Sequence, residues 1–203
     1  MVRIPLYIKV VASLAILGAA AGVASLATFA SFTSSTAAQA QSLTSGTVSL
    51  TIGAANRLTV GATNLVPGDT IQRAVDITNN GSAGTSSVGS IALTTTAPVT
   101  TSLLDTDTTN GLQMVIDKCS VAWTESGPPY TYTCSGVTSA VLASRAVIGA
   151  NMALSNMTAI TAGNTDHLRV TLTLPAGAGN TLQGQSSTLN YVFTANQRAA
   201  TNQ

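Results

Sequence analysis

Charged side chains are scarce in this 203-residue sequence. Asp, Glu, Lys and Arg make up 7% of it, whereas a typical soluble domain contains about 25%. The formal net charge of +1 leaves no cluster of basic side chains for phosphates, so we expect no nucleic-acid partner. The sequence has a single histidine, His167, a single glutamate, Glu125, and two cysteines. This shortage of catalytic and metal-binding side chains predicts a protein that is not an enzyme and has no cofactor.

Hydroxyl side chains are abundant instead, with 32 threonines and 21 serines. They alternate with apolar residues in short runs, most clearly in residues 168–174 (LRVTLTL). Such alternation is typical of antiparallel strands with one buried face, and threonine suits the solvent-facing side. About eight runs, separated by turn residues, predict an all-β fold, an antiparallel β-sandwich of the jelly-roll type. Residues 139–157, rich in Ala, Leu and Met, would also permit a helix.

The N-terminus has the pattern of a secretory signal peptide. Arg3 and Lys9 precede an uncharged run, and Thr28-Phe29-Ala30 places small residues three and one before a cut. We expect cleavage between Ala30 and Ser31 rather than a retained anchor, because the run is short for a membrane span. The chain would then have three parts: a signal peptide (1–30), an N-terminal segment (31–45) and one β-sandwich domain (46–203).

The two cysteines are predicted to form a disulfide. A turn at Ser126-Gly127 would fold the chain back so that Cys119 faces Cys134 and Trp123 faces Tyr130. In an exported protein such a pair forms a disulfide, and no CxxC spacing suggests a reactive or metal-binding pair. Closing a loop of this length would stabilise the fold by about 3 kcal/mol.

Asp105 and Asp107 form the one loop with the spacing of metal ligands. Two carboxylates two residues apart in a polar loop suit calcium. The loop's glycine, Gly111, comes one place too late for an EF-hand, and its twelfth position is Ile116. We therefore favour a solvated turn without a metal, with calcium binding as the alternative.

Three segments together resemble the TasA/camelysin family. Phe32 at the signal exit and residues 43–50 (LTSGTVSL) are similar to the family's N-terminal pattern, (F/L)xSGT(L/V)xL. Residues 64–69 (NLVPGD) and 79–82 (NNGS) resemble its NLxPGD…NNGS unit, and residues 180–197 match NxxQGxSxxLxxxFxAxQ. Each motif alone is ordinary, but their order along the chain is specific. The middle of the chain, roughly residues 98–165, departs from the pattern.

The resemblance implies a jelly-roll protein that is exported through a dedicated signal peptidase. It would assemble into extracellular fibres of a bacterial biofilm matrix or cell surface. In such fibres the N-terminal segment of one subunit completes the sheet of the next. Residues 31–41 are uncharged and free of Pro and Gly, which suits strand addition, although a disordered leader is the alternative. The donor-strand candidates are Ser31, Phe32, which would fill a pocket, and Leu43.

The expected partners are other copies of the chain, the signal peptidase, and a minor fibre or anchoring protein. Two other functions stay open at this point. Camelysin-type proteins have been labelled surface metalloendopeptidases, and the resemblance carries that possibility to this chain. A monomeric surface adhesion module is the other alternative.

Overall fold

The computed structural model describes residues 49–52, 58, 65–81, 88–98 and 102–199. All of them belong to one compact unit, Ser45–Gln203. The predicted signal peptide, its cleavage point and the N-terminal segment 31–45 lie outside the described residues. No helix in the described part of the chain is long and apolar enough to cross a membrane.

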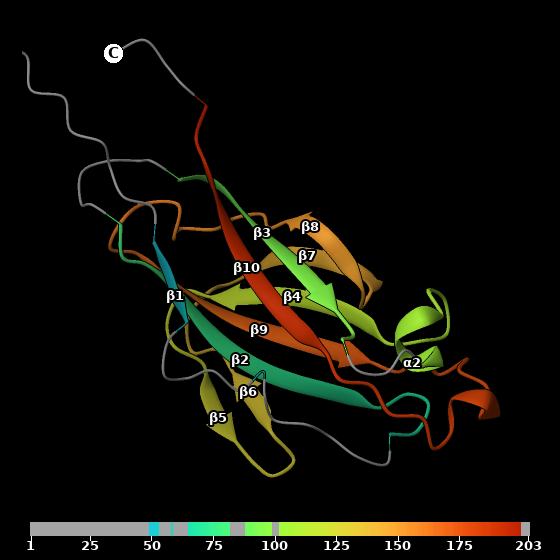
Figure 1. The fold of residues 1–203 in the computed structure, drawn as a ribbon. Helices are drawn as coiled ribbons and strands as arrows, with labels where there is room; N and C mark the ends of the chain where they lie inside the picture. Colours follow the sequence, from blue (N-terminus) through green and yellow to red (C-terminus); the bar gives the residue numbers. More distant parts are fainter. Residues whose placement is uncertain (1–48, 53–57, 59–64, 82–87, 99–101, 200–203) are drawn as a thin grey trace, which may run out of the picture. The chain divides into compact units, whose positions relative to one another are not determined.

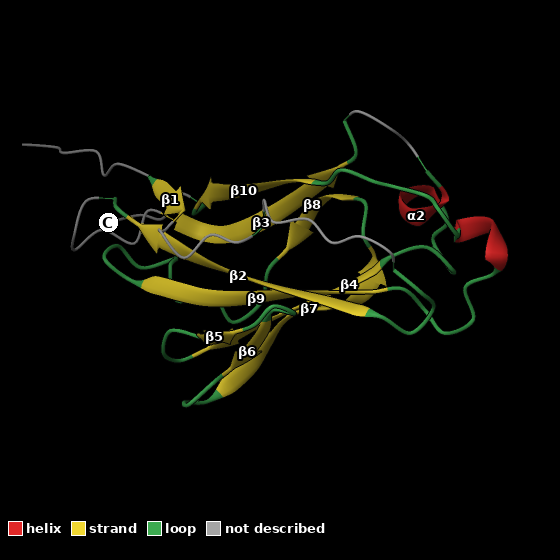
Figure 2. Ribbon diagram, turned by 90° about the horizontal axis from the view of Figure 1, so that it is seen from below, coloured by secondary structure: helices red, strands yellow, loops and turns green. Residues whose placement is uncertain are grey.

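The described residues form antiparallel sheets in layers, which confirms the predicted all-β sandwich (Figures 1 and 2). One sheet has five strands in the order β1-β2-β9-β4-β7, the other has three in the order β10-β3-β8, and β5 and β6 form a separate hairpin. The strands are β1 Leu50–Ile52, β2 Thr70–Asn79, β3 Val88–Thr96, β4 Gln113–Cys119, β5 Thr124–Ser126, β6 Thr131–Thr133, β7 Thr138–Ala146, β8 Gly149–Ala153, β9 Thr165–Thr173 and β10 Asn190–Gln197. Two short helices, α2 (Leu103–Thr106) and η1 (Asn180–Leu182), lie in the connections.

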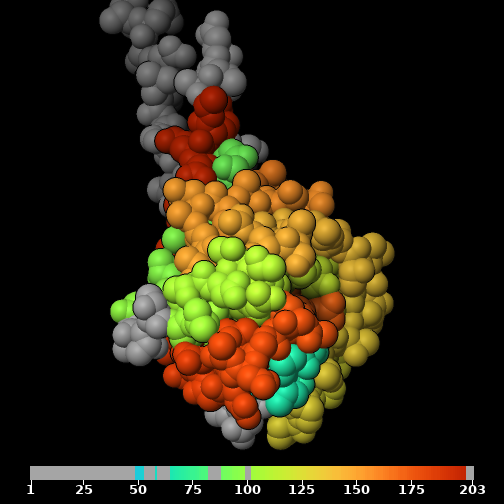
Figure 3. All heavy atoms as spheres, turned by 90° about the vertical axis from the view of Figure 1, so that its right-hand side faces the viewer, coloured from blue at the N-terminus to red at the C-terminus, as the bar shows by residue number. Residues whose placement is uncertain are grey.

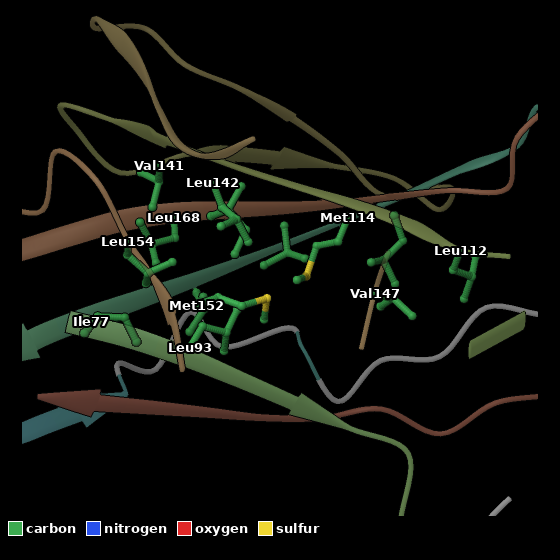
Figure 4. Close-up of a cluster of buried hydrophobic side chains, with 14 of the residues drawn as sticks. Ile77, Leu93, Leu112, Met114, Val141, Leu142, Val147, Met152, Leu154 and Leu168 are labelled. Carbon is green, nitrogen blue, oxygen red and sulfur yellow. The ribbon is translucent and has the colours of Figure 1, made fainter. Parts of the chain in front are cut away.

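The core lies between the two sheets and is built by the alternation seen in the sequence. In β9, Leu168, Val170 and Leu172 are buried, whereas the threonines between and beyond them are partly exposed. Apolar side chains from both sheets point toward one another across this layer (Figure 4). β9 lies in the middle of the larger sheet, paired with β2 on one side and β4 on the other.

Residues 139–157 form strands and not a helix. β7 pairs with β4 at the edge of the five-stranded sheet, and β8 pairs with β3 in the other sheet. The chain therefore crosses between the layers here. Backbone pairing with two different sheets outweighs the helical preference of Ala, Leu and Met.

The disulfide between Cys119 and Cys134 is present, with the Cα atoms 5.7 Å apart. The register predicted for the hairpin is wrong, however. Glu125 faces Tyr132 in the β5–β6 hairpin, so the aromatic ladder with Trp123 opposite Tyr130 does not form. The reason is that β4 ends at Cys119 and the chain turns away from it, which lets Trp123 donate a hydrogen bond from Nε1 to the carbonyl of His167 at 2.9 Å.

Candidate functional site: an open sheet edge beside a polar cluster

β2 is only partly paired on its outer edge. One side of β2 pairs with β9 from Thr70 to Thr78, but β1 pairs only with Ile77, Thr78 and Asn79 on the other side. Residues 53–57 and 59–64, which follow β1 along the chain, lie outside the described residues. β10 is also an edge strand, paired with β3 alone in the described part, and β1 contacts it (Figure 1). One side of the sandwich thus presents two sheet edges.

Partly buried apolar side chains line the core next to these edges. They pack against the buried cluster from both sheets and include Leu50, Ile71, Leu189, Tyr191 and Phe193. Burial raises the pKa of Tyr191 to about 12, so its hydroxyl stays neutral well above the usual range. The backbone of β2 already has side-chain partners on this part of the strand, because the carbonyl of Gln72 accepts from Arg73 and the backbone of Ala74 donates to Tyr132.

Arg73 lies at this edge with its side chain folded over its own strand. The residue is only 8% exposed, and Nη1 donates to the carbonyl of Gln72 at 2.7 Å. The guanidinium also lies over the ring of Tyr130, 5.3 Å from the centroid. An inward-lying charge on an edge strand is a known means of limiting uncontrolled strand pairing. Arg73 therefore protects part of the β2 edge.

The β5–β6 hairpin stands on the outer face of the five-stranded sheet (Figure 2). Its Tyr132 is buried, donates from the hydroxyl to Glu125 at 2.8 Å and accepts from the backbone of Ala74. Burial and the bond to Glu125 raise the pKa of Tyr132. The hairpin is held at its base by the disulfide, so it stays next to the β2 edge.

Two ion pairs lie on the same outer face. The Nδ1 atom of His167 is 2.7 Å from Oδ1 of Asp76, and both side chains are partly buried. Arg169 pairs with both oxygens of Asp117, at 3.1 and 2.5 Å, and its guanidinium lies 4.3 Å from the ring centroid of Trp123. The described bases on this face are thus matched by neighbouring acids, and the cluster holds the hairpin to the sheet.

Asp166 faces the opposite way, into the sandwich. Its Oδ1 accepts from Nζ of Lys118 at 2.9 Å and from the hydroxyl of Thr158 at 2.7 Å. Its Oδ2 accepts from the backbone N–H groups of Thr158 and Ala159, both at 2.8 Å. The residue is 2% exposed. Asp166 therefore fixes the loop between β8 and β9 to the sheet, a role that the sequence analysis missed.

Asp105 and Asp107 both cap local structure. Asp105 is buried, accepts from the backbone of Ser102 at the start of α2, and accepts from the hydroxyl of Ser187 at 2.6 Å. This last bond joins α2 to the segment after η1, and the two regions lie side by side in Figure 3. Asp107 accepts from the backbone N–H groups of Thr109 and Asn110, which lower its pKa. The prediction of a solvated turn is right for Asp107 but not for Asp105, which is buried. Calcium binding by this loop stays a prediction.

These features define a disulfide-linked antiparallel β-sandwich. Comparison with known families then places the chain. The family model described as camelysin metallo-endopeptidase matches residues 7–202, and the protein belongs to this family. The resemblance inferred from the three sequence segments is therefore confirmed. No significant similarity to a curated protein was found.

The family assignment corrects one expectation from the sequence. A protein without enzymatic activity was predicted, but the family is described as a metallo-endopeptidase, which contradicts that prediction. The prediction was wrong because it used the amino-acid composition, which only counts side chains of each type. The family assignment rests instead on the order of motifs along nearly the whole chain.

The residues of the structure do not fit a catalytic metal ion of the usual kind. Every acidic residue, the histidine and both cysteines lie within the described residues, and no three of these side chains gather in one place there. The cysteines are joined to each other, and His167 is paired with Asp76. A zinc centre in a peptidase needs three protein ligands around one point. No catalytic step through a metal follows from this arrangement.

Proposed function

We propose that this protein is a secreted structural subunit that assembles with other copies of itself into extracellular fibres of a bacterial matrix or cell surface. The observation that carries the proposal is the outer edge of β2, where β1 pairs with Ile77, Thr78 and Asn79 in the described part of the chain. The N-terminal segment 31–45 of a neighbouring copy is the proposed occupant. The signal peptidase would free that segment, and a minor fibre or anchoring protein would attach the fibre.

The length and composition of the N-terminal segment also support the proposal. Fifteen extended residues would span about 50 Å, enough to leave one copy and reach the sheet edge of the next. Phe32 would contribute an aromatic side chain to the apolar floor, near Ile71 and Phe193. Arg73 would have to release the Gln72 carbonyl, which would then accept from the incoming backbone.

Two variants test the proposal from opposite sides. Deleting residues 31–41 from the mature protein removes the donor, and Gln72→Pro removes an N–H from the acceptor edge. Gln72 suits this test because of the direction of its backbone groups. Its N–H and its carbonyl lie on the same side of the strand, and that side faces the edge and not β9. We expect folded monomers from both variants and long fibres from the unmodified mature protein, seen by electron microscopy. Fibres of normal length from the deletion variant would refute strand donation.

Proteolysis is a second candidate function, favoured by the family description alone. It predicts that the purified mature protein cleaves a protein substrate and that a chelator stops the cleavage. His167 is the only imidazole in the chain, so His167→Ala should then remove the activity. Activity that survives in this variant would mean that the imidazole is not a ligand.

A further inference from the structure

The β5–β6 hairpin reaches across the five-stranded sheet from β4 to β2. At one end, the disulfide joins Cys134, just after β6, to Cys119 at the end of β4. Over β9, in the middle, the guanidinium of Arg169 donates to the carbonyl of Tyr132 at 3.1 Å. At the other end, β6 lies against β2 (Figures 1 and 2). The hairpin is thus fastened to β4 and β9 and makes its outermost contact with β2.

Two side chains occupy backbone groups of β2 at this contact. The hydroxyl of Tyr132 accepts from the N–H of Ala74. The carbonyl of Gln72 accepts from Nη1 of Arg73 at 2.7 Å. These backbone groups lie on the side of β2 away from β9, so a strand added along this edge would pair with them. Because an N–H has one hydrogen to donate, such a strand cannot pair with Ala74 while the hydroxyl of Tyr132 is in place.

Other residues of the hairpin hold both side chains in position. The hydroxyl of Tyr132 donates to Glu125 at 2.8 Å, and the two residues face each other across the hairpin. The ring of Tyr130 lies against the guanidinium of Arg73, with 5.3 Å between the guanidinium carbon and the ring centroid. Tyr132 and Arg73 are both buried. The hairpin and this part of β2 therefore form one contact, in which hairpin side chains stand where a neighbouring strand would lie.

We propose that the hairpin is an autoinhibitory cover of the β2 edge, and that the N-terminal segment of a second copy pairs with Gln72 and Ala74 only after the hairpin has moved away. The inference rests on the proposed fibre function. A sheet edge that is left open pairs with other chains without selection, and a cover prevents this in the free subunit. The incoming backbone would replace Tyr132 as the acceptor and Arg73 as the donor, so no backbone group of β2 would be left without a partner.

The disulfide determines how easily the hairpin moves. Residues 120–137 connect β4 to β7, and the disulfide holds the end of β6 at the end of β4, with the two Cα atoms 5.7 Å apart. Without it, hydrogen bonds and side-chain contacts alone would hold this connection to the sheet, and the hairpin would gain conformational freedom away from β2. Removing the disulfide should therefore expose the edge more often and speed up strand addition.

The rate of fibre assembly tests the cover. Replacing both Cys119 and Cys134 with Ser releases the hairpin from β4. Met114→Ala is the matched control, because it removes a buried side chain of β4 and so destabilises the fold while the hairpin stays tied. We expect the double variant to form fibres after a severalfold shorter lag than the unmodified mature protein, followed by light scattering and electron microscopy. The lag of Met114→Ala should equal that of the unmodified protein.

The failure of the cover and the failure of the fibre function give different results. An unchanged lag in the double variant, or an equally shortened lag in Met114→Ala, would overturn the cover, and the fibres themselves would still support the fibre function. Fibres from the double variant alone would support both. Absence of fibres from all three proteins would contradict the fibre function and the proposed role of the cover with it.

Hydrogen exchange in the free subunit gives a second measurement that does not depend on fibres. Tyr132→Phe removes the acceptor of the Ala74 N–H and keeps the aromatic ring. The N–H of Val75 is the internal control, because neighbouring residues of a strand point to opposite sides and Val75 therefore faces β9. We expect the Ala74 amide to exchange about fivefold faster in this variant, the ratio that corresponds to one hydrogen bond, and the Val75 amide to be unchanged. Unchanged exchange at Ala74, or equal acceleration at both amides, would overturn the inference.

Discussion

Removing the buried carboxylate of Asp166 should destabilise the fold more than any other single change to a charged residue in the described part. Asp166→Ala leaves the ammonium of Lys118 without its ion-pair partner, and the side chain of Lys118 is only 13% exposed. It also leaves the N–H groups of Thr158 and Ala159 without their acceptor. Breaking a buried ion pair costs about 3–5 kcal/mol, and an unsatisfied buried N–H costs about 1–3 kcal/mol. Since Lys118 can turn partly toward water, we expect a loss of about 4 kcal/mol, a large part of the stability of a small domain.

Urea denaturation followed by the fluorescence of the single tryptophan, Trp123, measures this loss. Asp76→Ala is the matched control, because the side chain of Asp76 is 22% exposed and pairs with one residue, His167. That variant should lose about 0.5–1 kcal/mol. Hydrogen exchange of the Thr158 and Ala159 amides should accelerate in Asp166→Ala and not in Asp76→Ala. A loss below about 1 kcal/mol in Asp166→Ala would refute the assignment of a buried, fully paired carboxylate.

Three further results are expected. Replacing both Cys119 and Cys134 with Ser should lower the free energy of unfolding by about 3 kcal/mol in denaturant titrations, because the closed loop spans 15 residues. Tyr191 should lose its proton only near pH 12 in the folded protein, as followed by phenolate absorbance. The unfolded chain releases this proton near pH 10. The free energy of unfolding should therefore fall by about 2–3 kcal/mol as the pH rises from there to about 12, and a Tyr191→Phe variant should lack this loss. A lysine at position 169 cannot pair with both oxygens of Asp117 as the guanidinium of Arg169 does, and it would also lose the contact with the Trp123 ring. Arg169→Lys should therefore shift the fluorescence emission of Trp123 and lower the free energy of unfolding by about 1 kcal/mol. An unchanged emission spectrum would contradict the contact.

Some features of the site could have been found in the sequence. Asp166 is in phase with Leu168, Val170 and Leu172, so the strict alternation already places it on the buried side of β9. A carboxylate at such a position needs donors, and this signal was available. The donors themselves, Lys118 and the backbone at residues 158–159, come from other parts of the chain and have no mark in the sequence. The pairing of Asp76 with His167 is hidden for the same reason, because the two residues are 91 positions apart.

The sequence by itself determined the strand periodicity, the disulfide pair and the family. Each of these depends on residue type and on order along the chain, both of which are local or written directly in the sequence. Only the tertiary structure decided the register of the β5–β6 hairpin, the order of strands in each sheet and the gathering of all described charges away from the three-stranded sheet. The physical reason is that alternation tells which side of a strand is buried but not which strand lies beside it. Neighbours in a sheet are selected by packing of the whole core, and that packing brings together residues that lie far apart along the chain.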